Sequence, residues 1–274
     1  MLLVRGAQGD AVKGLQRGLN KLGALLLVDG DFGAGTEAAV VEARDTLQCP
    51  GPAAADDELL AMLVATPELS PDLTGAGLSF IGREEVSSPA DYRTRYRHPT
   101  WPSPNSGITI GIGYDLRFAN VAKLQADWGS VLPASIIARF APVLGTRGSD
   151  ELLGKVADIE IPLPAAISVF VYRMMPEHIR NTRIAYPGVD ALPPTRRTAL
   201  ISLVFNRGND LEGDRRREMK QIRDLLVAGN LDPIAAQLEA MVRLWDPQTE
   251  GGIIERRRRE AILWRDGFGA LQLD

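Results

Sequence analysis

Thr109 and Asp115 lie on either side of two glycines in the stretch SGITIGIGYDLRF, residues 106–118. From Ile108 onward, apolar residues alternate with Thr109, Gly111, Gly113 and Asp115. A period of two predicts a half-buried strand or a hairpin. On one straight strand, Thr109 and Asp115 would be about 20 Å apart. A tight hairpin centred on Gly111–Gly113 would instead place them opposite each other, with Cβ atoms about 4.5–5.5 Å apart.

A hydroxyl and a carboxylate this close hold one water between them, which is the arrangement of a general base with an orienting group. Glycine weakens a strand and is kept where another backbone or a ligand must come close. The alternative is a structural turn in which Asp115 caps the next segment, and the spacing alone leaves both interpretations open.

A general acid is expected upstream, in LSFIGREEVSSPADY, residues 78–92. We predict a helix from about Leu78 that ends near SSP, with Leu78, Ile81 and Glu85 on its apolar face. Partial burial favours the protonated form of a carboxyl, as a general acid requires. The neighbouring Glu84 lies below Phe80 instead, and either glutamate could be a solvated surface charge.

Two carboxylates flanking a glycosidic bond are what glycoside hydrolysis requires. If one of them activates a water, the reaction inverts, and the two carboxyls lie about 6.5–9.5 Å apart. The chain lacks the residues that metal-dependent, serine-nucleophile and nucleotide-binding enzymes require. The chain has one cysteine and two distant histidines, too few for a zinc hydrolase, and it has no G-x-S-x-G or Walker motif. We therefore expect neither a metal nor a cofactor.

The first 66 residues predict a separate helical module. Apolar spacing indicates a helix over 10–22 with Asp10 as its N-cap, and a second helix from Thr36, as N-cap, to Leu47. The turn-rich loop DGDFGAG separates them, and DDELLAML forms a third short helix. A stretch rich in Pro, Ser, Thr and Gly follows, so we expect a module at 1–66, a linker at 67–76 and a second domain at 77–274.

The segments LVRGAQGDAVKGLQRGLNKLG, VDGDFGAGTEAAV and DDELLAML resemble the three-helix peptidoglycan-binding module of bacterial and phage wall enzymes. The resemblance covers about sixty residues, with one copy. Most of the matching glycines and leucines build the helical bundle. Because a polar and aromatic loop can contact sugars and peptide stems, the expected binding residues are Asp29, Asp31 and Phe32.

A glutamate on a short helix followed by TIGIGYDL resembles the phage-type lysozymes, glycoside hydrolase family 24, and their relative pesticin. The T-even phage enzyme has its catalytic aspartate before the threonine, but HPTWPSPNSG contains no acid. Pesticin has its aspartate after the glycines, as Asp115 is here. The resemblance therefore implies Glu85 as acid ahead of Glu84, Thr109 as water ligand and Asp115 as base, with Asp91 in reserve.

The resemblance extends to TALISLVFNRG, a buried central helix that would bring Asn206 to the cleft, and to RLWDPQTEGGIIERRRREAILW, with Trp245 near the active-site wall. It implies a mainly helical α+β fold in which the lysozyme-like domain has a small β-hairpin. Each of the four tryptophans is expected to pack in the core by default. Trp101, which lies in a proline-flanked loop, is the best candidate for an exposed sugar contact.

These observations predict a muramidase that cleaves the β-1,4 bond between N-acetylmuramic acid and N-acetylglucosamine. A lytic transglycosylase on the same fold would need the glutamate but no water-activating carboxylate. A third possibility is a non-catalytic wall-binding protein, since the aspartate before Thr109 is missing.

Composition limits the partners and location. The net charge of -4 points to neither nucleic acid nor membrane. We interpret the runs Arg215–Arg217 and Arg256–Arg259 as mostly solvated helix faces with ion pairs, with attraction to anionic wall or lipopolysaccharide as the alternative. Without a signal peptide or a long apolar run, we expect a monomer made in the bacterial cytoplasm that acts on peptidoglycan at the wall. A phage or prophage endolysin and a secreted effector both fit.

Overall fold

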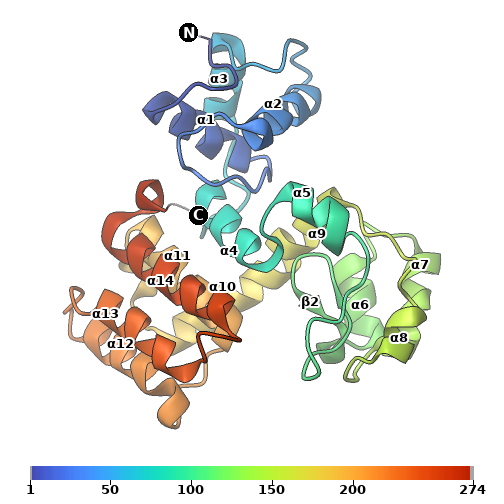
Figure 1. Cartoon of the computed structure of the whole chain (residues 1–274), viewed down its shortest axis with the longest axis vertical. Helices are drawn as coiled ribbons and strands as arrows, with labels where there is room; N and C mark the ends of the chain where they lie inside the picture. Colours follow the sequence, from blue (N-terminus) through green and yellow to red (C-terminus); the bar gives the residue numbers. More distant parts are fainter. Residues whose placement is uncertain (1, 272–274) are drawn as a thin grey trace. The chain divides into compact units, whose positions relative to one another are not determined.

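The computed structural model describes residues 2–271 of the chain (Figure 1). Helices make up 60% of it, and one small antiparallel sheet joins β1 (Thr109–Ile110) to β2 (Tyr114–Asp115). The predicted mainly helical α+β class is therefore confirmed.

The chain divides into two compact units. One contains the residues up to Ile81 and from Glu177 onward, and the other is Gly82–Pro176. Both boundaries fall inside helices, α4 (Gly75–Val86) and α10 (Met175–Ala185). The division falls within the segment predicted as one domain at 77–274, and the predicted module at 1–66 is in the same unit as residues 177 onward. Helix α4 begins inside the predicted linker at 67–76.

The first three helices share a hydrophobic core. They are α1 (Asp10–Asn20), α2 (Ala34–Thr46) and α3 (Asp57–Ala65), as the apolar spacing predicts. The buried side chains of this core are those of Leu3, Val12, Leu15, Leu19, Leu26, Phe32, Ala39, Val40, Ala43, Ala55, Leu59 and Leu63. Leu3 and Ala55 exchange two backbone hydrogen bonds of 2.9 Å, which hold the start of the chain beside the segment that leads into α3.

Two predicted helix caps are wrong. Asp10 is the first residue of α1 and follows the N-cap Gly9, where its charge still favours the positive end of the helix. Thr36 lies inside α2, whose N-cap is Gly33. The Thr36 hydroxyl is buried and accepts a hydrogen bond from Gln16 Nε2 at 3.3 Å, so a tertiary contact uses the group that the sequence suggested as a cap.

The unit Gly82–Pro176 contains the hairpin and five helices within its described residues: α5 (Pro89–Asp91), α6 (Val121–Trp128), α7 (Ala134–Arg139), α8 (Asp150–Gly154) and α9 (Leu163–Val169). In Figure 1 these helices and β2 are the green to yellow part of the chain. Trp128 is 1% exposed and packs edge-on against Tyr114, with ring centroids 5.6 Å apart. Trp128 therefore has the core position expected by default.

The second half of the other unit is built around α11 (Pro194–Arg207). Residues 198–204 of α11 are all buried, which confirms the predicted buried helix. The helices that follow it are α12 (Arg217–Val227), α13 (Ile234–Ala240) and α14 (Gly251–Asp266), drawn in orange to red in Figure 1. Trp264 on α14 is 2% exposed and also belongs to the core.

The arginine run on α14 is not a solvated face throughout, so that interpretation is wrong for Arg256 and Arg257. Arg256, Arg257 and Glu260 are 4%, 0% and 0% exposed. Glu260 Oε1 accepts hydrogen bonds from Arg257 Nη2 at 2.8 Å and from Ser202 Oγ of α11 at 2.6 Å. Four consecutive arginines cover all sides of a helix, so the face that packs on α11 must bury some of them. A buried carboxylate compensates their charge.

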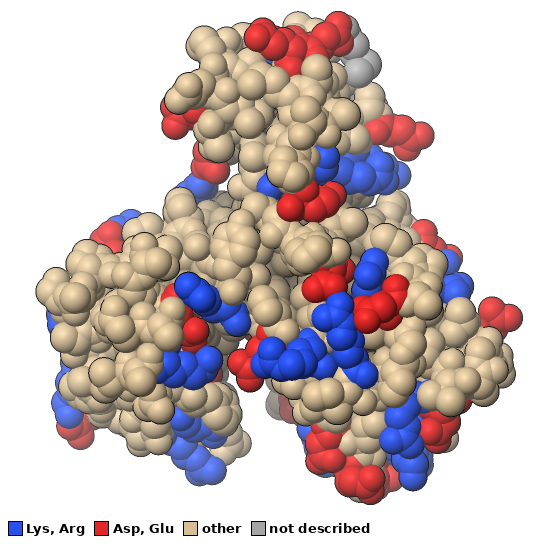
Figure 2. All heavy atoms as spheres, turned by 180° about the vertical axis from the view of Figure 1, so that it is seen from behind, with Lys and Arg blue, Asp and Glu red and all other residues tan. Residues whose placement is uncertain are grey.

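Charge elsewhere on the surface is mixed. On the face drawn in Figure 2, basic and acidic side chains are interspersed. Among residues 2–271, every helix is too short or too polar to cross a lipid bilayer.

Candidate active site

The hairpin has the register that the sequence predicts. Thr109 pairs with Asp115 and Ile110 with Tyr114, and residues 111–113 form the turn. Thr109 also exchanges backbone hydrogen bonds with Thr100, at 2.8 and 2.9 Å, on its other edge. The threonine and the aspartate are therefore directly opposed residues of one short ribbon.

Glycine is required at positions 111 and 113 of the turn for different structural reasons. Both have positive φ, +60° at Gly111 and +73° at Gly113, a conformation that favours glycine. A Cβ on Gly111 would lie 2.7 Å from Trp128 Cη2, so its missing side chain makes room for the core and not for a ligand, in contrast to the prediction. A Cβ on Gly113 would lie 3.0 Å from Glu85 Oε2.

Glu85 therefore reaches the hairpin. It lies in the last turn of α4, four residues after the fully buried Ile81, and is half-buried as predicted. Glu84 is half-buried too, so exposure does not separate the two. Contact with Gly113 does distinguish Glu85, because its carboxylate is the group that occupies the space beside the turn.

The carboxylate of Asp115 is engaged by backbone groups. Its Oδ1 accepts hydrogen bonds from Arg117 N at 2.8 Å and from Gly107 N at 3.1 Å. Asp115 is thereby the N-cap of a 3₁₀ turn, Leu116–Phe118. Gly107 and Arg117 are beyond the paired residues, on the side away from the turn. The carboxylate thus points away from Gly113, as the capping alternative predicts.

Asp91, the expected reserve base, and Thr109, the expected water ligand, have different surroundings. Asp91, the reserve base, accepts a hydrogen bond of 2.7 Å from Ser88 Oγ, and Ser88 Oγ in turn accepts from Asp91 N at 3.0 Å, so the pair caps α5. Thr109 is partly exposed, and within residues 2–271 its hydroxyl makes no hydrogen bond. The Thr109 hydroxyl is therefore available to a water or a substrate.

Trp101 is half-buried rather than open. Its indole packs over Gly148, where a Cβ would lie 2.5 Å from Trp101 Cδ1. Part of the ring is exposed for a sugar contact, but its Nε1 is buried without a hydrogen-bond partner among the described residues.

In the N-terminal module, a residue that sequence analysis did not single out for binding organises the predicted binding loop. Gln16 is 1% exposed and donates to Asp29 Oδ1 at 2.6 Å and to the Asp31 carbonyl at 3.0 Å. Its own oxygen accepts from Gly30 N at 2.9 Å. Asp29 and Asp31 are exposed, but Phe32 is 0% exposed, so the prediction that its ring contacts a ligand is wrong. Its apolar ring instead anchors the loop to the module core.

Asn206 and Trp245 line one pocket in the unit that contains residues 177–271. The pocket has a volume of about 290 Å³, and its other lining residues are Arg207, Arg215, Arg216 and Ile253. The Arg207 guanidinium lies over the Trp245 ring, 5.0 Å from its centroid. From the sequence alone, Arg215 and Arg216 are expected to belong to a surface run. Their place soon after the central helix is a signal that could have indicated this role. The sequence does not show that four separate segments meet at one pocket.

Among residues 2–271, no group of three or more histidine, cysteine, aspartate or glutamate side chains is arranged to hold a metal ion. The single cysteine, Cys49, is a buried free thiol.

Comparison with models of known protein families found no match to this chain. A search of curated proteins likewise found no sequence with significant similarity. The candidate site therefore rests on its geometry and on the motif resemblance.

Proposed function

We propose that the chain cleaves the glycan strands of bacterial peptidoglycan, with Glu85 as the general acid. The observation that carries the proposal is the contact between the Glu85 carboxylate and Gly113, in the turn of the ribbon that pairs Thr109 with Asp115. A half-buried carboxyl at the turn can protonate a leaving oxygen, and the Thr109 hydroxyl of the same ribbon, which makes no hydrogen bond within residues 2–271, can hold the nucleophile.

In the hydrolytic form of the proposal, the chain is a muramidase. Glu85 protonates the oxygen between N-acetylmuramic acid and N-acetylglucosamine, and Thr109 orients a water. Asp115 would deprotonate that water on the opposite face of the sugar, which gives inversion. Substrate binding must then free one Asp115 oxygen, because Oδ1 accepts from Arg117 N and Gly107 N, and Oδ2 also accepts from Gly107 N at 3.2 Å.

The engagement of Asp115 favours a second candidate, a lytic transglycosylase. That reaction uses the muramyl 6-hydroxyl as its nucleophile and closes a 1,6-anhydro ring. It needs one glutamate, which acts first as acid and then as base, and it requires no second carboxylate. Asp115 can then remain a cap.

Product analysis separates the two reactions. Purified peptidoglycan digested by the full chain should release muropeptides, with reducing ends for the hydrolase and 1,6-anhydro ends for the transglycosylase. Glu85→Gln should abolish release while its melting temperature stays close to that of the parent. Glu84→Gln is the matched control and should retain activity. Equal activity of Glu85→Gln and the parent would overturn the assignment of the acid.

Wall binding by the N-terminal module is the second part of the proposal, and the loop held by Gln16 supports it. Gln16→Leu should weaken sedimentation of the full chain with purified walls, because Asp29 and the Asp31 carbonyl lose their common donor. Gln8→Leu is the control, since Gln8 is exposed and makes one long contact of 3.4 Å to Asp31. Equal binding by both variants would contradict a role for this loop.

A further inference from the structure

The pocket lined by Asn206 and Trp245 contains three arginines from two segments. Arg207 is the last residue of α11, and Arg215 and Arg216 belong to a 3₁₀ turn, Asp214–Arg216. Within residues 2–271, Arg207, Arg215 and Arg216 have no carboxylate within ion-pair distance. Carboxylates within residues 2–271 thus do not pair with them directly, and the charge of Glu218 acts on Arg207 only at longer range.

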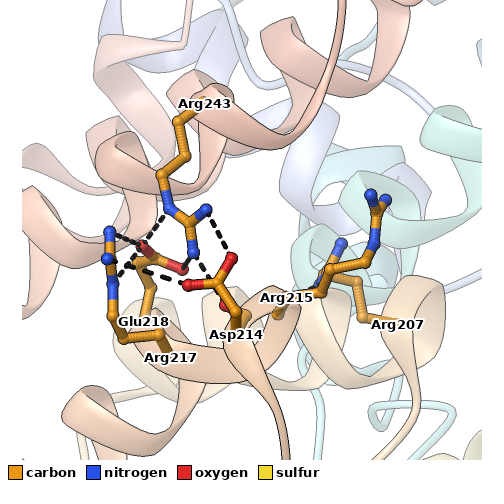
Figure 3. Close-up of polar contacts among 6 residues, drawn as sticks. All are labelled: Arg207, Asp214, Arg215, Arg217, Glu218 and Arg243. Atoms are coloured by element: carbon orange, nitrogen blue, oxygen red, sulfur yellow. Dashed lines mark hydrogen bonds and ion pairs between the residues drawn. The ribbon is translucent and has the colours of Figure 1, made fainter.

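Two acids close to Arg215 and Arg216 in the sequence, Asp214 and Glu218, are already occupied. Arg243 Nε contacts Glu218 Oε1 at 2.7 Å, and its Nη1 contacts Asp214 Oδ2 at 3.0 Å. Arg217 Nη2 is 3.0 Å from Glu218 Oε1 as well. In Figure 3 these four side chains form one connected network, and the side chains of Arg207 and Arg215 lie apart from its carboxylates. Neither acid is free to serve the pocket.

Arg207 is held in an unfavourable setting for a cation. Its Nη2 donates to the Arg215 carbonyl at 2.5 Å, but its Nε is buried without a hydrogen-bond partner among the described residues. Burial first, and then repulsion from Arg216, Arg257 and Arg215, lowers the pKa of Arg207 to about 10, which leaves it charged at neutral pH. An anion in the pocket would relieve the repulsion.

We infer that this pocket binds a carboxylate carried on an organic group, and that Arg207, Arg215 and Arg216 recognise its oxygens. Guanidinium groups bind carboxylates through paired, charge-assisted hydrogen bonds. The indole of Trp245 and the side chain of Ile253 offer apolar contacts to the carbons beside that carboxylate, and the Asn206 amide can bond a neighbouring peptide group. An inorganic anion would use the arginines alone.

If the chain acts on peptidoglycan, the ligand is a free carboxylate of the wall peptide. This identification rests on the proposed function, whereas carboxylate binding itself does not. The pocket would then select walls by the charge state of their peptides, since amidation removes the group that the arginines recognise.

The test is a ligand titration of the full chain, monitored by the NMR signal of the Trp245 indole N–H. That signal is assigned by its absence in the spectrum of Trp245→Phe. The probes are glutarate, its neutral diamide glutaramide and inorganic phosphate, at constant ionic strength. Glutarate should give a saturable shift that weakens at least about tenfold in Arg215→Gln. Arg223→Gln is the matched control, because it removes one positive charge from α12 while Arg223 pairs with Asp224 outside the pocket.

Binding of glutaramide as tight as that of glutarate, or equal weakening in the two arginine variants, would overturn carboxylate recognition. Tighter binding of phosphate than of glutarate would overturn the choice of an organic carboxylate. Glu85→Gln should bind glutarate like the parent, so a failure of wall cleavage is distinguishable from a failure of the pocket. In wall digests, chemical amidation of the peptide carboxylates should raise the KM of the parent toward that of Arg215→Gln.

Discussion

The carboxylate of Glu85 lies beside the bare Cα of Gly113, so that a Cβ at this glycine would be 3.0 Å from Glu85 Oε2. Glu85 is on a helix and Gly113 is in the turn of a hairpin. A side chain at position 113 would occupy the space that the Glu85 carboxylate fills. This contact joins the expected acid to the ribbon that carries Thr109 and Asp115.

Gly113→Ala should therefore impair activity more than stability. Alanine at φ +73° costs about 1–2 kcal/mol in folding free energy, and its methyl group would displace the Glu85 carboxylate. We expect wall cleavage to fall by about tenfold or more. Gly145→Ala is the matched control, because φ there is +69° and the nearest atom to its Cβ is 3.9 Å away. Turbidity assays and thermal melts of both variants check this; equal activities would contradict it.

The two roles considered for Asp115, general base and N-cap, can be tested separately. Asp115→Asn keeps an oxygen that can accept from Gly107 N and Arg117 N, so its melting temperature should stay close to that of the parent. Asp115→Ala loses the cap and should unfold about 1 kcal/mol more easily. If Asp115 is the base, both variants lose wall cleavage by about 100-fold or more. Full activity of Asp115→Asn with anhydro products would instead establish the transglycosylase.

Glu260 should be among the most sensitive positions for stability. Glu260→Gln leaves the buried Arg256 and Arg257 beside a neutral amide, and breaking a buried ion pair costs about 3–5 kcal/mol in folding free energy. Glu255→Gln is the control on the same helix, since its pair with Arg258 is on the surface and contributes about 0–1 kcal/mol. Urea unfolding of both variants measures the difference. Equal losses of unfolding free energy in the two variants would contradict the prediction that burial makes the Glu260 ion pairs important for stability.

The N-terminal module should lose a stabilising contact in acid. Asp56 is the N-cap of α3, and the hydrogen bond from Leu59 N, followed by that from Arg44, lowers the pKa of its carboxyl below the ordinary 3.8. A lowered pKa in the folded state means that the stabilisation is present above pH 3.8 and disappears as the pH falls through the folded value. Asp56→Asn should be less stable than the parent at about pH 6 and nearly equal to it at about pH 2. A gap that persists in acid would contradict this cause.

Residue spacing alone predicts the local features that have a strong period or an unambiguous turn. It predicted the three apolar stripes of α1–α3, the buried stretch of α11 and the pairing of Thr109 with Asp115. These follow from side-chain spacing and from glycines at a tight turn, which neighbouring residues decide among themselves.

The contacts that those residues make follow instead from the tertiary structure. It brought the Glu85 carboxylate to Gly113, turned Asp115 toward Gly107 and placed Phe32 in the core. It also buried Arg257 against Glu260 and collected Arg207, Arg215 and Arg216 around one pocket. Each of these depends on which face of an element packs against a partner distant in sequence, and residue spacing within one element does not determine that partner.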